Sequence, residues 1–143
     1  MYRNILVPLD GSSLAEEILP QVKELARLTG AEISLLRVAL VHTFPGADPT
    51  DRQVEATQKA QEYLEKLADQ LKKEGLKVSV HVRYGYDAVE IIDHAEQEDI
   101  DLVAMSTHGR TGVGRWALGS VSERVLRHSP KPVLLTRARE NLV

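Results

Sequence analysis

The chain has 143 residues, 43% of them hydrophobic, which suits one compact domain around one buried core. Its 18 Lys and Arg against 21 Asp and Glu give a formal charge of -3, which does not attract a polyanion, so no nucleic-acid partner is expected. The absence of cysteine excludes disulfides and thiolate chemistry. The sequence shows no secretory signal and no apolar run of the roughly 20 residues that span a bilayer, so it predicts a cytoplasmic protein with no membrane partner.

The N-terminal region reads as a strand followed by a helix. The apolar run 4–9 is closed by the turn residues 10–13, which predicts a buried strand. Ser13 to Glu16 matches a capping box, and apolar residues recur at helical spacing as far as Gly30. Pro20 lies inside this pattern and predicts a kink in the helix.

The middle of the chain repeats the same order. Residues 33–40 form a second apolar strand, followed by a Pro- and Gly-bearing loop from His42 to Asp51. Residues 56–71 carry the cleanest helical stripe of the sequence, and Gly75 is placed to end that helix. Residues 77–83 then alternate polar and apolar, which indicates a strand near the edge of a sheet.

The last part contains two further helices and two further strands. A capping box at 87–90 begins the third helix, residues 102–105 form the fourth strand, and a Gly-rich loop covers 106–118. A capping box at 120–123 begins a helix that stops before Pro130, and 133–136 form the fifth strand. Strands that alternate with helices predict a single α/β domain over residues 1–143, with a parallel sheet between two helical layers.

Such sheets bind ligands beyond the carboxyl ends of their strands, so the loops after the first, second and fourth strands are the ones to inspect. The loop from Met105 to Ser120 is the most informative, because its glycines allow close backbone approach and its end opens a helix. A helix N-terminus stabilises a phosphate, so this loop is a candidate phosphate cradle. The alternative is that Ser120 only caps its helix and the glycines form a flexible connection. Neither the G-x-x-x-x-G-K-[ST] nor the G-x-G-x-x-G loop occurs.

The spacing of this loop resembles a known family. Gly109, nine further residues and then Gly119-Ser120 are similar to the G-x-x-G-x9-G-[ST] motif of ATP-binding universal stress proteins. The resemblance extends over the chain, through residues 5–12, 35–38, 101–110 and 119–125. It implies a three-layer α/β sandwich with a five-stranded parallel sheet of order 3-2-1-4-5, which is Rossmann-like. One position departs from the motif, because Ser106 stands where its first glycine is expected.

The resemblance also implies a set of nucleotide contacts. Asp10 would accept a hydrogen bond from the ribose or adenine, although a turn before Gly11 also explains an aspartate there. Pro8 would either shape the pocket wall or simply end its strand. The backbone of Val38 would pair with the adenine edge. Met105 would either pack on the base or ribose or belong to the core.

The remaining implied contacts surround the ribose and phosphates of ATP, which Mg2+ or Mn2+ would accompany. They are Ser106, Gly109, Arg110, Gly119, Ser120, Val121 and Ser122. The extra CH2OH of Ser106 would either lower affinity or supply a hydroxyl to the ligand.

No catalytic or metal-ligating set is evident from the sequence. His108 has no carboxylate or nucleophile fixed beside it, and the histidines lack metal-ligand spacing. The sequence therefore predicts a nucleotide-responsive regulatory module of the stress response, with a slow ATPase and a dimeric scaffold with a vestigial site as alternatives. Pro132 cannot donate to a ladder, which places the apolar segment 131–137 at an open sheet edge and predicts a homodimer through it.

Overall fold

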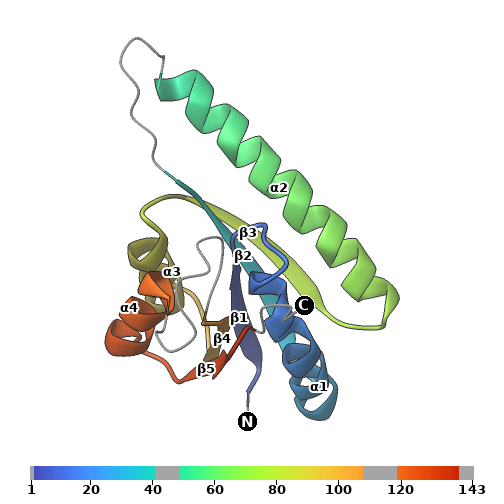
Figure 1. Cartoon of the computed structure of the whole chain (residues 1–143). Helices are drawn as coiled ribbons and strands as arrows, with labels where there is room; N and C mark the ends of the chain where they lie inside the picture. The colour runs from blue at the N-terminus through green and yellow to red at the C-terminus, as the bar shows by residue number, and fades with distance from the viewer. Residues whose placement is uncertain (1, 41–48, 108–118, 139–143) are drawn as a thin grey trace, which may run out of the picture.

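The computed structural model describes residues 2–40, 49–107 and 119–138, which form one parallel sheet between two layers of helices (Figure 1). The elements in chain order are β1 (Asn4–Leu9), the 3-10 helix η1 (Ala15–Ile18), α1 (Leu19–Thr29), β2 (Glu32–Leu40), α2 (Pro49–Lys73), β3 (Val78–Gly85), α3 (Asp87–Gln97), β4 (Leu102–Ser106), α4 (Ser120–His128) and β5 (Val133–Thr136).

The sheet has the order β3-β2-β1-β4-β5, as the resemblance implied. All neighbouring strands are parallel, and β3 and β5 are the edges. The chain moves outward from β1 to β2 and β3, then crosses to the other side of β1 for β4 and β5. This reversal leaves a switch point between β1 and β4, where folds of this class hold their ligands.

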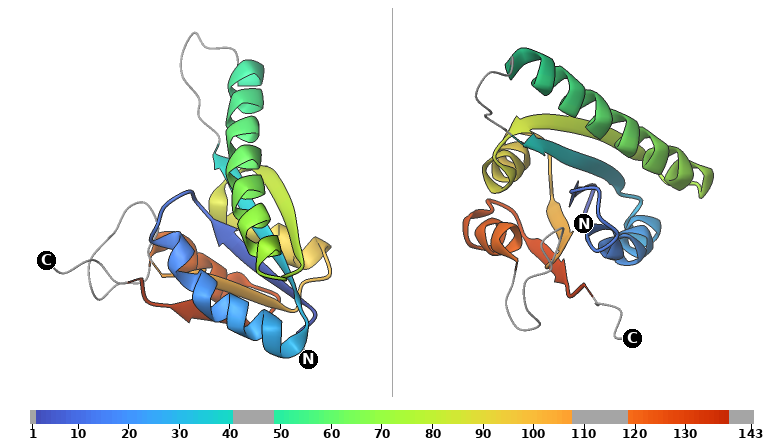
Figure 2. Two further views of the ribbon diagram at one scale, coloured as in Figure 1. Left: turned by 90° about the vertical axis from the view of Figure 1, so that its right-hand side faces the viewer. Right: turned by 45° about the horizontal axis from the view of Figure 1, so that its top comes forward.

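Helices cover both faces of the sheet (Figure 2), and each face carries its own apolar core. Alternate residues of β1 separate them, since Ile5 and Val7 pack under α1 and α2 whereas Leu6 packs under α3 and α4. The buried centre of β1 thus lies between two helical layers, which explains its nearly continuous apolar sequence. None of the helices in the described part of the chain is both long and apolar enough to cross a membrane.

The start of α1 differs from the prediction. Ser13 does not cap a helix. The residues after it form η1 instead, and Ser12 Oγ accepts a hydrogen bond from the N–H of Ala15 at 3.1 Å. Pro20 lies in the first turn of α1 rather than in its interior, so the predicted kink is wrong. The first turn accepts proline without loss, because its N–H groups have no partner within the helix.

The other two capping boxes are also wrong in detail. Asp87 and Ser120 are the first residues of α3 and α4, and the capping positions belong to Tyr86 and Gly119, neither with a side-chain cap. The second helix begins earlier than its apolar stripe, at Pro49, so residues 49–51 are helical instead of loop. Proline at the first helical position and an acidic residue in the first turn, Asp51, both favour this earlier start.

Candidate nucleotide site

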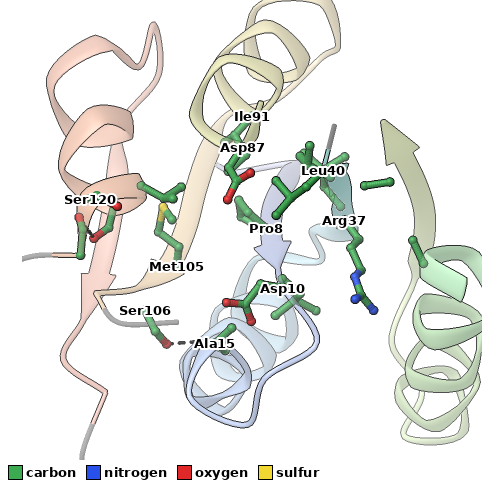
Figure 3. A pocket seen from close by; sticks show the side chains of 18 of the residues that line it. Pro8, Asp10, Ala15, Arg37, Leu40, Asp87, Ile91, Met105, Ser106 and Ser120 are labelled. Atoms are coloured by element: carbon green, nitrogen blue, oxygen red, sulfur yellow. Dashed lines mark hydrogen bonds between the residues drawn. The ribbon is translucent and has the colours of Figure 1, made fainter. Parts of the chain in front are cut away.

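The carboxyl ends of β1, β2 and β4 surround a cavity of about 400 Å³ (Figure 3). It lies at the switch point of the sheet, and the first turns of α3 and α4 and one face of α2 complete its wall. Each of these strand ends brings a different kind of chemical group to the cavity.

The end of β1 supplies a carboxylate held in a fixed turn. Asp10 Oδ1 accepts hydrogen bonds from the N–H of Ser12 at 2.9 Å and from Ser12 Oγ at 2.5 Å. Between them Gly11 adopts a φ of +88°, which an L side chain rarely adopts, and a Cβ there would lie 3.1 Å from the guanidinium of Arg37. The turn therefore needs glycine, and it presents Asp10 at the cavity.

The end of β2 supplies backbone groups. Its pairing with β3 continues to Leu40 opposite Gly85, whereas its pairing with β1 ends at Arg37 opposite Leu9. The edge of β2 that faces β1 therefore extends beyond the end of β1 over residues 38–40. Val38 and Leu40 lie on this stretch and line the cavity.

A cationic side chain stands between β2 and α2. The guanidinium of Arg37 lies over the ring of Tyr63 at 5.0 Å from its centroid, and Tyr63 donates a hydrogen bond to Glu16 at 2.7 Å. Burial and the adjacent Glu16 carboxylate raise the pKa of the Tyr63 hydroxyl, which therefore remains a donor at neutral pH. These contacts fix α2 against β2 and hold Arg37 in the cavity wall.

The end of β4 positions the first turn of α4. The carbonyl oxygen of Thr107 accepts hydrogen bonds from the N–H of Gly119 at 2.7 Å and from Ser122 Oγ at 2.9 Å. Gly119 has an ordinary φ of -59°, but a Cβ there would overlap the carbonyl oxygen of Thr107. Glycine is required at this position for close approach of two backbones. The result is a helix N-terminus at the cavity, where an anion is stabilised.

The hydroxyl of Ser106 bonds to the protein rather than standing free in the cavity. Ser106 is buried, and its Oγ donates to the carbonyl oxygen of Ala15 at 3.3 Å. The serine that replaces the first glycine of the motif thus joins β4 to η1.

The structure brings nine of the eleven predicted site residues around this one cavity. They are Pro8, Asp10, Val38, Met105, Ser106, Gly119, Ser120, Val121 and Ser122. The other two, Gly109 and Arg110, lie outside the described residues, as does His108.

Comparison with known proteins identifies the family. The model of the universal stress protein family matches residues 1–137 of the chain. The chain belongs to the universal stress protein family. The universal stress protein MJ0577 of Methanocaldococcus jannaschii is 31% identical in an alignment that covers 99% of this chain and 98% of the relative. The solved structure of MJ0577 has a TM-score of 0.84 to this one, with 34% identity and 99% of both chains covered.

Two more distant structures share the fold of this universal stress protein. One is a universal stress protein in complex with cAMP, at 19% identity and a TM-score of 0.69, covering 96% of this chain and 98% of its own. The other is a family protein of Arabidopsis thaliana with AMP bound, at 16% identity and a TM-score of 0.72, covering 97% and 94%.

The structure adds cavity residues that sequence reasoning missed. They come from β2, α2 and α3 and include Leu36, Arg37, Leu40, Ala56, Lys59, Ala60, Asp87 and Ile91. Asp87 was detectable in principle, because α3 begins at the carboxyl end of β3 and so at the same side of the sheet. Its acidic side chain was instead interpreted as a helix cap.

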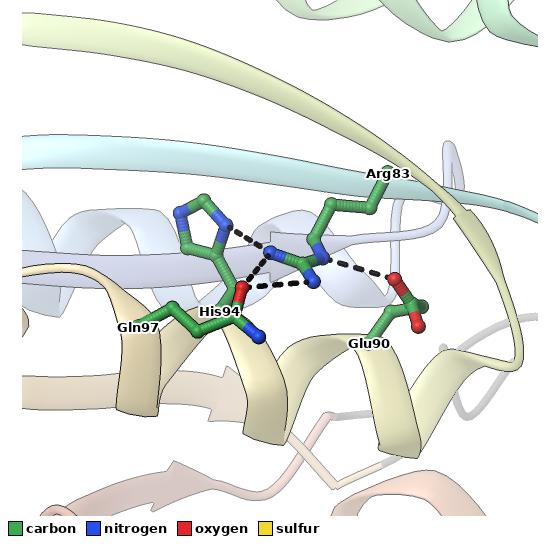
Figure 4. Close-up of polar contacts among 4 residues, drawn as sticks. All are labelled: Arg83, Glu90, His94 and Gln97. Carbon is green, nitrogen blue, oxygen red and sulfur yellow. Dashed lines mark hydrogen bonds and ion pairs between the residues drawn. The ribbon is translucent and has the colours of Figure 1, made fainter.

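The helix α3 is anchored to the edge strand β3 by one arginine (Figure 4). Arg83 Nε donates to Glu90 Oε1 at 3.0 Å, and its two Nη atoms donate to Gln97 Oε1 at 3.3 Å. Arg83 Nη1 also lies 3.4 Å from His94 Nδ1. These contacts span two turns of α3 and thereby fix the helix that carries Asp87 and Ile91 to the cavity.

No group of three or more potential metal ligands occurs among the described residues. A divalent ion at the cavity would therefore take most of its ligands from a bound phosphate chain and water, which is the usual mode for Mg2+.

Proposed function

We propose that this universal stress protein binds an adenine nucleotide, ATP with Mg2+ or Mn2+, and acts as a nucleotide-responsive regulatory module in the stress response. The observation that carries the proposal is the cavity itself, which has the N-terminus of α4 on one wall and an apolar region beside the β2 edge on another. A phosphate suits the first, because N–H groups of the first helical turn have no partner within the helix. A purine base suits the second.

Two further facts support the choice of an adenine nucleotide. Two proteins of the same fold were solved with cAMP and AMP, so this fold can hold adenine nucleotides. The edge of β2 beyond Arg37 offers backbone donors and acceptors of the kind that the N6 and N1 edge of adenine needs.

A binding role is favoured over rapid hydrolysis. Transfer of phosphate to water needs an oriented water molecule and neutralised charge, which known enzymes achieve with a positioned Gln, Asp or Glu and a Lys or Arg. The described residues beside α4 (105–107 and 119–122) include no such side chain. We expect ATP turnover to be very slow. A single-turnover assay with radiolabelled ATP tests this expectation, and rapid release of phosphate would favour the alternative function of an ATPase.

The decisive experiment is calorimetry of the purified protein with ATP, ADP, AMP and GTP, with and without Mg2+, together with mass spectrometry of any copurified ligand. We expect ATP to bind and GTP to bind much more weakly. Asp10→Asn keeps the acceptor to Ser12 but removes the charge, and we expect it to weaken ATP binding about tenfold, equivalent to about 1.4 kcal/mol. Asp69→Asn, on the exposed face of α2, is the matched control.

The proposal has a clear failure outcome. If no adenine nucleotide copurifies and calorimetry gives no heat of binding at millimolar ATP, the cavity is not a nucleotide site in this chain. The scaffold interpretation would then stand in its place.

A further inference from the structure

Asp87 places a second carboxylate in the cavity, from an element that the sequence motif does not include. It is the first residue of α3, it is partly buried, and it lines the cavity together with Ile91 one turn later on the same helix face. Figure 3 shows the Asp87 side chain leaving α3 in the direction of Pro8, with Leu40 nearby. Asp87 thus shares the cavity wall with Pro8, Leu40 and Ile91, on a different element from the N-terminus of α4.

The position of this carboxylate restricts how a nucleotide can lie. A polyphosphate is repelled by a carboxylate and attracted by the positive end of a helix, so the phosphates belong at residues 119–122 and not beside Asp87. Pro8, Leu40 and Ile91 offer apolar contact to a flat base. The base end of the ligand is therefore the part that meets Asp87.

The chemistry of the carboxylate determines what it can recognise. An ionised carboxylate only accepts hydrogen bonds, and its negative charge is favoured in the first turn of a helix. The adenine N6 amino group is a donor, whereas the 6-oxo group of hypoxanthine is an acceptor that a carboxylate would repel. The Arg83 contacts to Glu90 and Gln97 hold α3 in place, so the carboxylate has a defined position.

We propose that Asp87 is a specificity-determining residue that accepts a hydrogen bond from the exocyclic amino group of the bound adenine. This inference rests on the proposed function, since it concerns the same cavity. It goes beyond the family resemblance, which implies base recognition by the backbone of Val38.

Calorimetry with ATP, ITP and GTP on the unmodified protein, Asp87→Asn and Asp87→Ala tests the proposal. The unmodified protein should bind ATP at least tenfold more tightly than ITP. Asp87→Ala should lose about tenfold in ATP affinity and should gain affinity for ITP, because it removes the carboxylate that repels the 6-oxo group. Asp87→Asn should gain affinity for ITP, because a carboxamide can donate to the 6-oxo group, so the ATP to ITP ratio should collapse in both variants.

The matched control is Asp93→Asn, which changes an aspartate on the same helix outside the cavity and should keep the original ratio. Circular dichroism and the unfolding temperature establish that each variant is folded. Should Asp87→Ala be unfolded, the test rests on Asp87→Asn, which preserves the shape of the side chain.

The outcomes separate the two proposals. If the unmodified protein binds ATP and Asp87→Asn retains the ATP to ITP ratio, the assignment of Asp87 is wrong while the nucleotide site stands. If GTP binds more tightly than ATP and Asp87→Ala abolishes that preference, Asp87 recognises the N1–H and amino group of guanine and the adenine assignment is overturned. If the unmodified protein binds none of the three nucleotides, both proposals fail.

Discussion

Gly119 is the residue on which the geometry of the candidate phosphate end depends. Its N–H bonds to Thr107 and it has no room for a Cβ. A bulky residue at this position would disturb the connection between β4 and α4 before any ligand arrives. Loss of nucleotide binding in such a variant would therefore not by itself identify Gly119 as a ligand contact.

We expect Gly119→Ala to lower the free energy of unfolding by about 1–3 kcal/mol, because the methyl group must displace the Thr107 carbonyl. Urea denaturation without nucleotide measures it. Ser120→Ala, one residue on and exposed, is the control and should change stability by less than about 0.5 kcal/mol. Equal stability of both variants would mean that the two backbones can separate at no cost.

Ser106 raises a different question, because it replaces a glycine of the family motif. Its hydroxyl bonds to Ala15, so we expect Ser106→Gly to leave ATP affinity within about threefold. Stability should fall by about 0.5–1 kcal/mol, since glycine loses more backbone freedom on folding. Calorimetry and urea denaturation test both. A tenfold gain in ATP affinity would show instead that the serine side chain occupies ligand space.

At the scale of elements, α3 connects a cluster of basic side chains to the cavity. His94 is buried, the centroid of its ring lies 4.9 Å from that of His81, and its Nδ1 lies 3.4 Å from Arg83 Nη1. Its Nε2 has no hydrogen-bond partner in the described residues. Burial lowers the pKa of His94 from 6.5, the electrostatic effects of His81 and Arg83 lower it further, and Glu98 acts in the opposite sense.

This environment makes stability depend on pH. Below pH 6.5 the unfolded chain takes up a proton at His94 that the folded protein resists, so the free energy of unfolding decreases as pH falls. The slope from one proton is at most about 1.4 kcal/mol per pH unit.

We expect His94→Gln to reduce the loss of stability between neutral pH and about pH 5, because glutamine does not titrate. Urea denaturation across this range measures the slope. His128→Gln, at the exposed end of α4, is the control and should retain it. An unchanged slope in His94→Gln would place the acid sensitivity elsewhere in the molecule.

At the scale of the whole molecule, the open edge of β5 favours self-association. Among the described residues β5 pairs with β4 alone, and its residues are only partly buried in the single chain. The carbonyl groups of Pro132 and Thr136 accept hydrogen bonds from the N–H groups of Val103 in β4 and of Thr107 directly after it. The alternate residue Leu135 therefore directs its backbone groups to the open edge. A second copy pairing there would cover these groups.

We expect a homodimer by light scattering, and we expect Leu135→Pro to shift it toward monomer. Proline removes the outward N–H of this residue while the ladder to β4 keeps its donors and acceptors. Circular dichroism must show that the variant is folded. A monomer mass for the unmodified protein at all concentrations would contradict the prediction.

Local sequence patterns predicted the alternation of strands and helices and nine of the residues that line the cavity. They could do so because apolar periodicity and turn residues act locally, and because the carboxyl ends of parallel strands meet at one side of a sheet. The motif around Gly119 and Ser120 and the turn at Asp10 are likewise local in sequence.

Tertiary structure decided what depends on distant partners. The packing of η1 decides that Ser12, and not Ser13, accepts the hydrogen bond from Ala15. The packing of α3 likewise makes Asp87 a cavity residue instead of a cap. The requirement for Gly119 arises from a carbonyl twelve residues away, at Thr107. The lowered pKa of His94 arises first from its burial and then from His81 and Arg83 of β3. Such contacts join residues that no local pattern relates, so only the packed sheet and helices could determine them.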